Sequence, residues 1–309
     1  MTEVILYKPN GEQNTFYDIL AFKFEKDIYR SCTELFIQLK VPDGLQSDAI
    51  ARIKLNIDGK TIHDGLIDTV TYNSKYNFKS VKIYSRGFTS LLTQNEMIPG
   101  LHTDISLDKI MSMYYTFPNC VKWEQNTDTS NYIYVDDGDS MWDGVANLCY
   151  KLNGRYPYIR ETNTVQINLP SQDLVLEYNT DDLLSYQTVY DYTKFISHYH
   201  MQDIDDSYDK FYLVNSTALS MSIMRHKQIP FDRTYTSNPS QGLNFKSAYS
   251  NRGWSRNIAV VNGTPYADLN DMFTLNGIFE RKRISAICIT GNKNGVTTTF
   301  SMYHDNWSS

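Results

Sequence analysis

This 309-residue chain contains three histidines whose spacing could allow them to bind a metal ion. His198 and His200 lie two residues apart in "SHYH", which places both imidazoles on one face of a strand. His226 could lie nearby, but a zinc site needs three or four ligands and the sequence gives no reason to choose the others. We therefore expect strand histidines that face solvent or a partner, and no metal site.

The stretch "QDIDDSYDK" offers carboxylates close enough in sequence for acid and base chemistry. Two carboxylates that flank a sugar bond are the catalytic pair of a glycosidase. The acidic residues here are Asp203, Asp205, Asp206 and Asp209. Acidic clusters between β regions are usually solvated turns, and no second catalytic element can be identified. We favour a turn, with a carbohydrate-binding or glycan-cleaving site as the alternative.

A second acidic stretch, "VDDGDS", holds Asp136, Asp137 and Asp139 just before a predicted helix. Its spacing does not match a calcium loop. Carboxylates at a helix start are stabilised by the helix dipole and by capping, which explains the stretch without a ligand. The chain also has no GxSxG, HExxH, phosphate-loop or dinucleotide motif. The sequence therefore predicts a protein that is not an enzyme, with no catalytic residue, cofactor or metal.

Composition indicates a globular protein rich in aromatic side chains. Hydrophobic residues make up 41% and charged residues 21%, and there are 24 Tyr, 14 Phe and 4 Trp. Tyr favours strands and binding surfaces. The net charge is −6 and no run of Lys and Arg occurs, which argues against specific nucleic-acid binding. No apolar run approaches the roughly 18 residues of a membrane span, and the first residues do not form a signal peptide, so we expect no membrane anchor.

The cysteines are expected to be reduced and unpaired. No two of them lie within twenty residues of each other, so neither a metal knuckle nor a CxxC motif exists. Cys32, Cys149 and Cys288 have apolar neighbours and are predicted to be buried, and Cys120 is the fourth. Free thiols of this kind indicate folding in a reducing cytosol.

Two regions of alternating hydrophobicity flank a region with helical spacing. Residues 1–92 contain strand patterns such as "ELFIQLK" and "ARIKLNI", with every second residue apolar. Residues 93–172 contain two predicted helices, one capped by Ser106 and one running from Asp139 or Ser140 to Gly154, followed by the strand pattern "NTVQINL". Residues 173–309 return to strands and end in a hairpin that turns at 292–295. The predicted fold is mainly β with an α+β insert.

Two Asp-Gly pairs lie six residues apart, at Asp58-Gly59 and Asp64-Gly65. Asp58-Gly59 directly follows a strand pattern, and Asp-Gly is a preferred pair for a tight type I′ hairpin. Further alternating carboxylates and a closing Glu would mark a calcium loop, and neither is present. We predict that both pairs are corners of a sheet.

Residues 225–257 have little periodicity and many Ser, Asn, Gly and Arg residues, which predicts a long loop. Arg and Trp are typical anchors of protein contacts. The candidate subunit-interface residues in this loop are Arg225, Arg233, Arg252, Trp254 and Arg256. The alternative is a surface loop without a partner.

The order of these pieces resembles the baseplate hub proteins of contractile phage tails and R-type bacteriocins, the Mu-like tail hub or late control protein D-like family. Three stretches carry the resemblance: "LNIDGKTIHDGLIDTVTYNSKYNFKSVKIYSRGFTSLL", "DGDSMWDGVANLCYKLNGRYPYIRETNTVQI" and the closing hairpin. The resemblance spans nearly the whole chain as an order of elements. Residues 225–265 match no pattern of the family.

The resemblance implies two tail-tube-like β-barrel domains, at 1–92 and 173–309, joined by a small α/β domain at 93–172. It implies a homotrimer that adapts a sixfold tail tube to a threefold central spike, with tube, spike and other baseplate proteins as partners. The missing signal peptide and the free cysteines indicate assembly in the bacterial cytoplasm. The resemblance implies a later place in the released particle, with a channel through which DNA passes. A hub of a non-contractile tail is the alternative within this class.

Overall fold

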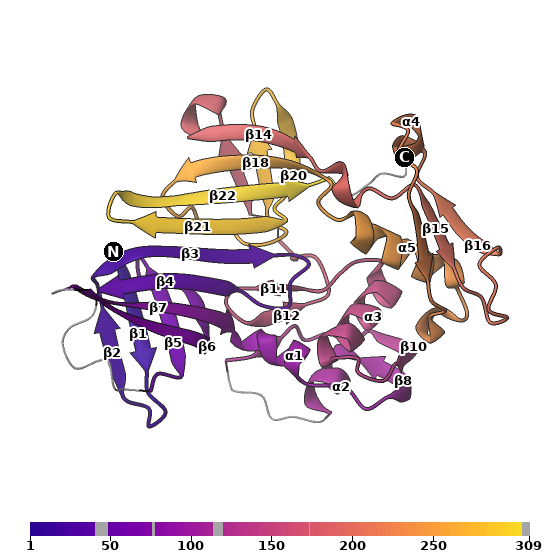
Figure 1. Ribbon diagram of the computed structural model, residues 1–309, viewed down its shortest axis with the longest axis horizontal. Coiled ribbons are helices and arrows are strands. Elements are labelled where there is room, and N and C mark those ends of the chain that lie inside the picture. Colours follow the sequence, from indigo (N-terminus) through magenta and orange to yellow (C-terminus); the bar gives the residue numbers. More distant parts are fainter. Residues whose placement is uncertain (41–48, 76–77, 114–119, 173, 305–309) are drawn as a thin grey trace.

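The computed structural model describes residues 1–40, 49–75, 78–113, 120–172 and 174–304. One antiparallel sheet of eleven strands forms its centre (Figure 1). In spatial order the strands are β14 (Ser185–Tyr190), β18 (Ser255–Asn262), β22 (Gly295–Tyr303), β21 (Ala286–Asn292), β3 (Ile19–Asp27), β4 (Glu34–Lys40), β7 (Phe78–Gly87), β6 (Lys60–Lys75), β5 (Arg52–Ile57), β1 (Thr2–Tyr7) and β2 (Gln13–Phe16).

The strands form where the sequence alternates between apolar and polar residues. Leu35, Ile37 and Leu39 of β4 are buried, as are Ile53 and Leu55 of β5. Burial of each such side chain contributes about 1.5–3 kcal/mol to folding. The predicted mainly β fold with an α+β insert is confirmed.

The two β regions share one sheet and one core. Strand β3 of the first region pairs with the whole length of β21 of the second, from Ala21↔Asn292 to Asp27↔Ala286. Residues from both regions, including Phe24 and Phe300, lie in the same buried cluster. The sequence patterns did not reveal this joint, because alternation fixes which face a strand buries and not which strand lies beside it. The division into segments at residues 93 and 173 stays a prediction.

Only one of the Asp-Gly pairs is a corner of the sheet. Asp58 and Gly59 have φ values of 50° and 78° and turn the chain from β5 into β6, which confirms the hairpin. Asp64 and Gly65 lie inside β6, so the prediction of a second corner at this pair is wrong. Glycine is required at position 65 because β6 and β7 approach each other closely there. A Cβ atom on residue 65 would lie 2.2 Å from the carbonyl oxygen of Arg86 on β7.

The insert packs short helices and strands around a second core. Its helices are α1 (Leu91–Gln94), α2 (Leu107–Ser112) and α3 (Met141–Asn153), and its strands are β8 (Gly100–Ser106), β9 (Lys122–Trp123), β10 (Thr129–Val135), β11 (Tyr158–Arg160) and β12 (Thr164–Gln166). Ser106 accepts from the backbone N of Lys109 as predicted. Ser140 and Asp143 form a capping box at the start of α3, and Gly154 ends that helix, which confirms both predicted boundaries.

Two small sheets complete the chain. Strand β13 (Val175–Tyr178) pairs with β19 (Met272–Leu275), which pairs with β20 (Phe279–Arg283). Strand β15 (His198–Met201) lies between β16 (Phe211–Val214) and β17 (His226–Ile229), and α4 (Ser216–Ser220) connects the last two. In Figure 1 this second sheet stands apart from the large one, at the opposite end from the N-terminal strands.

The predicted loop at 225–257 is wrong. The segment contains β17, the helix α5 (Pro239–Asn251) and the start of β18. Helix α5 was missed because its buried face carries only a few apolar residues, such as Leu243 and Phe245, among Gly, Ser and Asn. Asn238, which caps the helix through the backbone N of Gln241, and Pro239 at its first turn are the signal that could have found it.

The C-terminal hairpin of β21 and β22 is confirmed. All four cysteines are free thiols; Cys32 and Cys149 are buried, whereas Cys288, predicted to be buried, is partly exposed. Within the described ranges, the helices are too short and too polar for any of them to cross a bilayer.

Candidate functional site

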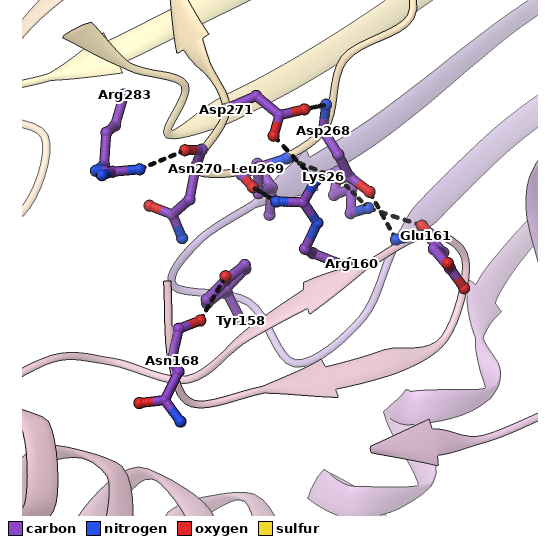
Figure 2. Close-up of polar contacts among 10 residues, drawn as sticks. All are labelled: Lys26, Tyr158, Arg160, Glu161, Asn168, Asp268, Leu269, Asn270, Asp271 and Arg283. Atoms are coloured by element: carbon purple, nitrogen blue, oxygen red, sulfur yellow. Dashed lines mark hydrogen bonds and ion pairs between the residues drawn. The ribbon is translucent and has the colours of Figure 1, made fainter. Parts of the chain in front are cut away.

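A polar junction joins three segments that are distant in sequence (Figure 2). Lys26, at the end of β3, donates to the carbonyl oxygen of Glu161 at 2.7 Å and to a carboxylate oxygen of Asp268 at 2.5 Å. The other oxygen of Asp268 accepts from the backbone N of Glu161 at 2.6 Å. Asp268 lies between β18 and β19, and Glu161 lies in the turn between β11 and β12. The junction therefore ties the insert to both β regions.

A second ion pair extends the junction. Arg160 donates to Asp271 at 2.9 Å and to the carbonyl oxygen of Leu269 at 3.3 Å. Asp271 in turn accepts from the backbone N of Asp268 at 2.7 Å, so both carboxylates are fixed by the same loop. Arg283 reaches the same loop through the carbonyl oxygen of Asn270. Figure 2 shows these side chains converging on the loop from three directions.

The charges in the junction are buried and balanced. Lys26 is 4% exposed and Asp271 1%. Burial lowers the pKa of Lys26, and the carboxylate of Asp268 opposes this effect. Burial alone would also lower the pKa of Arg160, but Asp271 and Asp268 outweigh it and raise the value. Because each of these cations has an anionic partner, the arrangement fastens the three segments to one another.

Sequence reasoning did not find the junction, although Lys26 carried a signal. Phe22, Phe24 and Lys26 alternate along β3, so Lys26 takes an inward position in a strand whose other inward residues are aromatic. A lysine at a core position must be paired. Its partners could not be read from the sequence, because Glu161 and Asp268 lie 135 and 242 residues away.

The structure brings the three histidines together. His198 pairs with His226 across β15 and β17, and their rings stack at 4.3 Å between centroids. Nε2 of His200 lies 3.3 Å from Nδ1 of His226. Burial and the two neighbouring imidazoles lower the pKa of His198. Among the residues described, no three His, Cys, Asp or Glu side chains are arranged to hold a metal ion.

The acidic stretches act as turn and cap residues. Asp203 is 6% exposed and accepts from the backbone N atoms of Asp205 and Ser207, both at 2.9 Å, so it shapes the turn in front of β16. Asp139 accepts from the backbone N of Asp136 before α3. Both observations agree with the turn and capping interpretations of the sequence.

A buried Ser85–His63 contact resembles a catalytic dyad, but the hydrogen bond between the two side chains runs from the histidine to the serine, opposite to the direction that catalysis needs. Ser85 donates its hydroxyl proton to the carbonyl oxygen of Leu66 at 2.6 Å, so it accepts from Nε2 of His63 at 2.8 Å. Nδ1 of His63 then accepts from Thr33 at 2.9 Å. The imidazole is neutral and fully bonded, and burial lowers its pKa to about 3. It has no free lone pair with which to activate the serine.

Four of the five candidate interface residues have clear partners within the chain. Arg225 donates to carbonyl oxygens of Tyr192, Thr193 and Phe195, and Arg233 donates to the hydroxyl of Tyr134 in the insert.

Arg252 lies 3.7 Å above the ring centroid of Tyr249. Trp254 is 8% exposed and stacks on Phe195 at 4.6 Å, so it anchors a core. Arg256 lies in β18 between Val189 and Tyr303 of the flanking strands. A role of these five residues in contacts between subunits stays a prediction.

No family model and no curated protein matches this sequence. The fold, however, is similar to solved structures over its whole length. The 43 kDa tail protein of prophage MuSo2 from Shewanella oneidensis has a TM-score of 0.71 at 13% identity, with 100% of both chains covered. The tail protein of Neisseria meningitidis MC58 has the same TM-score and identity, with 98% of this chain and 97% of that one covered. These likenesses show a shared fold.

A more distant structural neighbour comes from a secretion system. It is the E. coli c3393 protein, described as a component of the type VI secretion system with structural similarity to T4 bacteriophage tail proteins gp27 and gp5. Its TM-score is 0.55 at 9% identity, covering 94% of this chain and 75% of that one. The structural neighbours are thus phage tail and type VI secretion proteins, and the sequence pattern pointed to the first of these two classes.

Proposed function

We propose that the chain is a structural baseplate hub of a contractile phage tail or a related particle. The observation that carries the proposal is the full-length fold similarity to two prophage and bacterial tail proteins at a TM-score of 0.71. The described chemistry agrees with a structural role: the charges of the junction are paired, the Ser85–His63 contact has no free base, and the acidic stretches form turns.

The hub is a homotrimer that adapts a sixfold tube to a threefold spike. Each chain then supplies two tube-like β regions, so three chains offer six similar contacts. The joint between β3 and β21 supports this arrangement, because it fixes the spacing of the two regions through continuous backbone hydrogen bonds. Among the described residues, β2 and β14 are the edge strands of the large sheet, and such edges suit pairing with neighbouring copies or tube subunits.

Under this proposal the partners are the tail tube protein, the central spike protein and other baseplate proteins. Assembly takes place in the bacterial cytoplasm, and the hub leaves the cell as part of the released particle. The net charge of −6 suits an acidic channel lining, which would keep passing DNA from adhering.

Imaging of the intact particle tests the proposal. Purified particles from a strain that carries the gene with a small tag should show three copies of the chain between the tube and the spike. Six copies per baseplate, or a position on the sheath or a fibre, would overturn it. A sheath around the same tube assigns the particle to the contractile class, and a bare tube assigns it to the non-contractile class.

A further inference from the structure

The outer face of the small sheet formed by β16, β15 and β17 carries three imidazoles. Along β15, Tyr199 and Met201 point into the buried core beneath the sheet, with exposures of 0% and 1%. His198 and His200 alternate with them and therefore lie on the opposite, outer face. The strand register places His226 of β17 beside His198. The three rings are consequently brought together on one partly exposed surface.

Two of the ring nitrogens lie at a spacing that suits a shared metal ion. Nε2 of His200 is 3.3 Å from Nδ1 of His226, and the planes of the two rings differ by 13°. Zn–N bonds are about 2.0–2.1 Å long, so two imidazole nitrogens in one tetrahedral shell lie about 3.3 Å apart. Without an ion, one of these nitrogens donates a proton to the other. With an ion, both lone pairs are used as ligands at nearly the same separation.

The third imidazole, that of His198, orients the pair. Its ring stacks on His226 at 4.3 Å between centroids and 3° between planes. Ser197 donates its hydroxyl proton to the carbonyl oxygen of Arg225 at 2.8 Å, so it accepts from Nδ1 of His198 at 2.9 Å. These contacts fix the ring of His198 and, through the stack, the ring of His226. Over the described ranges no group of three side chains is arranged around an ion, so the pair has no third protein ligand there.

The ligand chemistry selects a class of metal. Imidazole nitrogen suits Zn²⁺, Cu²⁺ and Ni²⁺, whereas Mg²⁺ and Ca²⁺ prefer carboxylate, carbonyl and water oxygens. The residues that flank the histidines in the strand register are Tyr212, Val214 and Gln228, and none of these side chains is a carboxylate or an ammonium group. The face therefore offers nitrogen ligands to a transition-metal ion and no strong oxygen ligand to a hard cation.

We propose that His200 and His226 form an exchangeable two-histidine site for Zn²⁺ or a related divalent transition-metal ion. Two protein ligands leave the other coordination positions to water, so the ion stays open on its solvent side. The inference does not depend on the hub function, since it follows from the spacing of two ring nitrogens.

The sequence favoured no metal because it placed only His198 and His200 together. Those two lie on one strand, with ring centroids 6.4 Å apart. The parallel register of β15 and β17 brings His226 in from 26 residues away, and its Nδ1 is the nitrogen that faces Nε2 of His200. The ligand pair therefore differs from the pair that the sequence offered.

The test is a calorimetric titration of the whole chain with zinc chloride at neutral pH. We expect saturable binding of one Zn²⁺ per chain, reversed by a chelator. Magnesium chloride is the ligand control and should give no saturable binding, because Mg²⁺ requires oxygen ligands. Amide shifts caused by Zn²⁺ should be largest in β15 and β17.

Phenylalanine substitutions separate the two ligands from the stacking ring. His200→Phe and His226→Phe each keep a flat ring and remove one nitrogen ligand, so each should weaken Zn²⁺ binding about tenfold, a loss of about 1.4 kcal/mol. His198→Phe keeps the stack on His226 and removes no ligand, so affinity should change by less than about twofold. The proposal is overturned by an absence of saturable Zn²⁺ binding, by unchanged affinity in His200→Phe or His226→Phe, or by an equal loss in His198→Phe.

Discussion

Lys26 is a residue at which the first β region, the insert and the C-terminal region meet. Lys26→Met keeps the length and apolar volume of the side chain but leaves the carboxylate of Asp268 without its cation. Breaking a buried pair in this way costs about 3–5 kcal/mol. We expect a loss of that order in the free energy of unfolding, measured by urea denaturation.

The double variant Lys26→Met/Asp268→Asn separates the charge from the packing. It removes the uncompensated carboxylate and keeps a side chain that can still accept from the backbone N of Glu161. The double variant should therefore recover part of the lost stability. If it is no more stable than Lys26→Met, the ion pair does not carry the junction.

His63 makes stability depend on pH. Its pKa falls from 6.5 in the unfolded chain to about 3 in the fold, because burial excludes the charged form. The stability that neutral His63 contributes is therefore complete above pH 6.5 and is lost as the pH falls from 6.5 towards 3. Over that window the loss approaches about 1.4 kcal/mol per pH unit.

Few carboxylates titrate between pH 6.5 and 5, and the difference between a His63 variant and the original chain removes the contribution of the other histidines. We expect the unfolding free energy of His63→Gln to fall less steeply over this range than that of the original chain. His304→Gln replaces an exposed histidine and should leave the slope unchanged. A slope that is equal in His63→Gln and the original chain would contradict the assignment.

At the scale of elements, the capping box decides where α3 begins. Ser140→Ala removes the acceptor for the backbone N of Asp143 and should cost about 1 kcal/mol. Ser112→Ala is the control, since Ser112 is exposed at the end of α2 and its hydroxyl only donates back to Asp108. We expect a change below about 0.5 kcal/mol for this control in the same thermal or chemical unfolding experiment.

The pairing of β6 with β7 depends on Gly65. A Cβ atom at this position would meet the carbonyl oxygen of Arg86 at 2.2 Å and Nε2 of His63 at 2.7 Å. The backbone contact can be relieved only by separating the strands, so Gly65→Ala should destabilise the fold by at least about 1–3 kcal/mol. Ser74→Ala, at an exposed position of the same strand, should be nearly neutral, and hydrogen exchange of β6 and β7 would report the difference.

At the scale of the whole molecule, the β3–β21 joint couples the two β regions. Leu55→Ala and Phe300→Ala each remove a fully buried side chain, one from each region, and should cost about 2–5 kcal/mol. Because both residues belong to one core, we expect each substitution to lower the same unfolding transition. Calorimetry that resolves two transitions, each sensitive to only one substitution, would show that the regions are independent.

The sequence by itself determined the local structure of this protein. Alternation in β4 and β5 set their buried faces, Asp58-Gly59 set the first hairpin, and Ser140 with Gly154 set the limits of α3. Each of these features depends on residues a few positions apart, so local propensity and patterning are sufficient to predict it. The order of such features along the chain was also enough to suggest a tail protein.

Only the tertiary structure decided how distant segments meet. It joined β3 to β21, placed Lys26 against Asp268, stacked His226 on His198, and set His226 beside His200. It also turned the expected loop at 225–257 into β17 and α5, whose few apolar residues become a buried face only against the rest of the fold. These contacts span tens to hundreds of residues, and no period in the sequence records which partner a side chain will have.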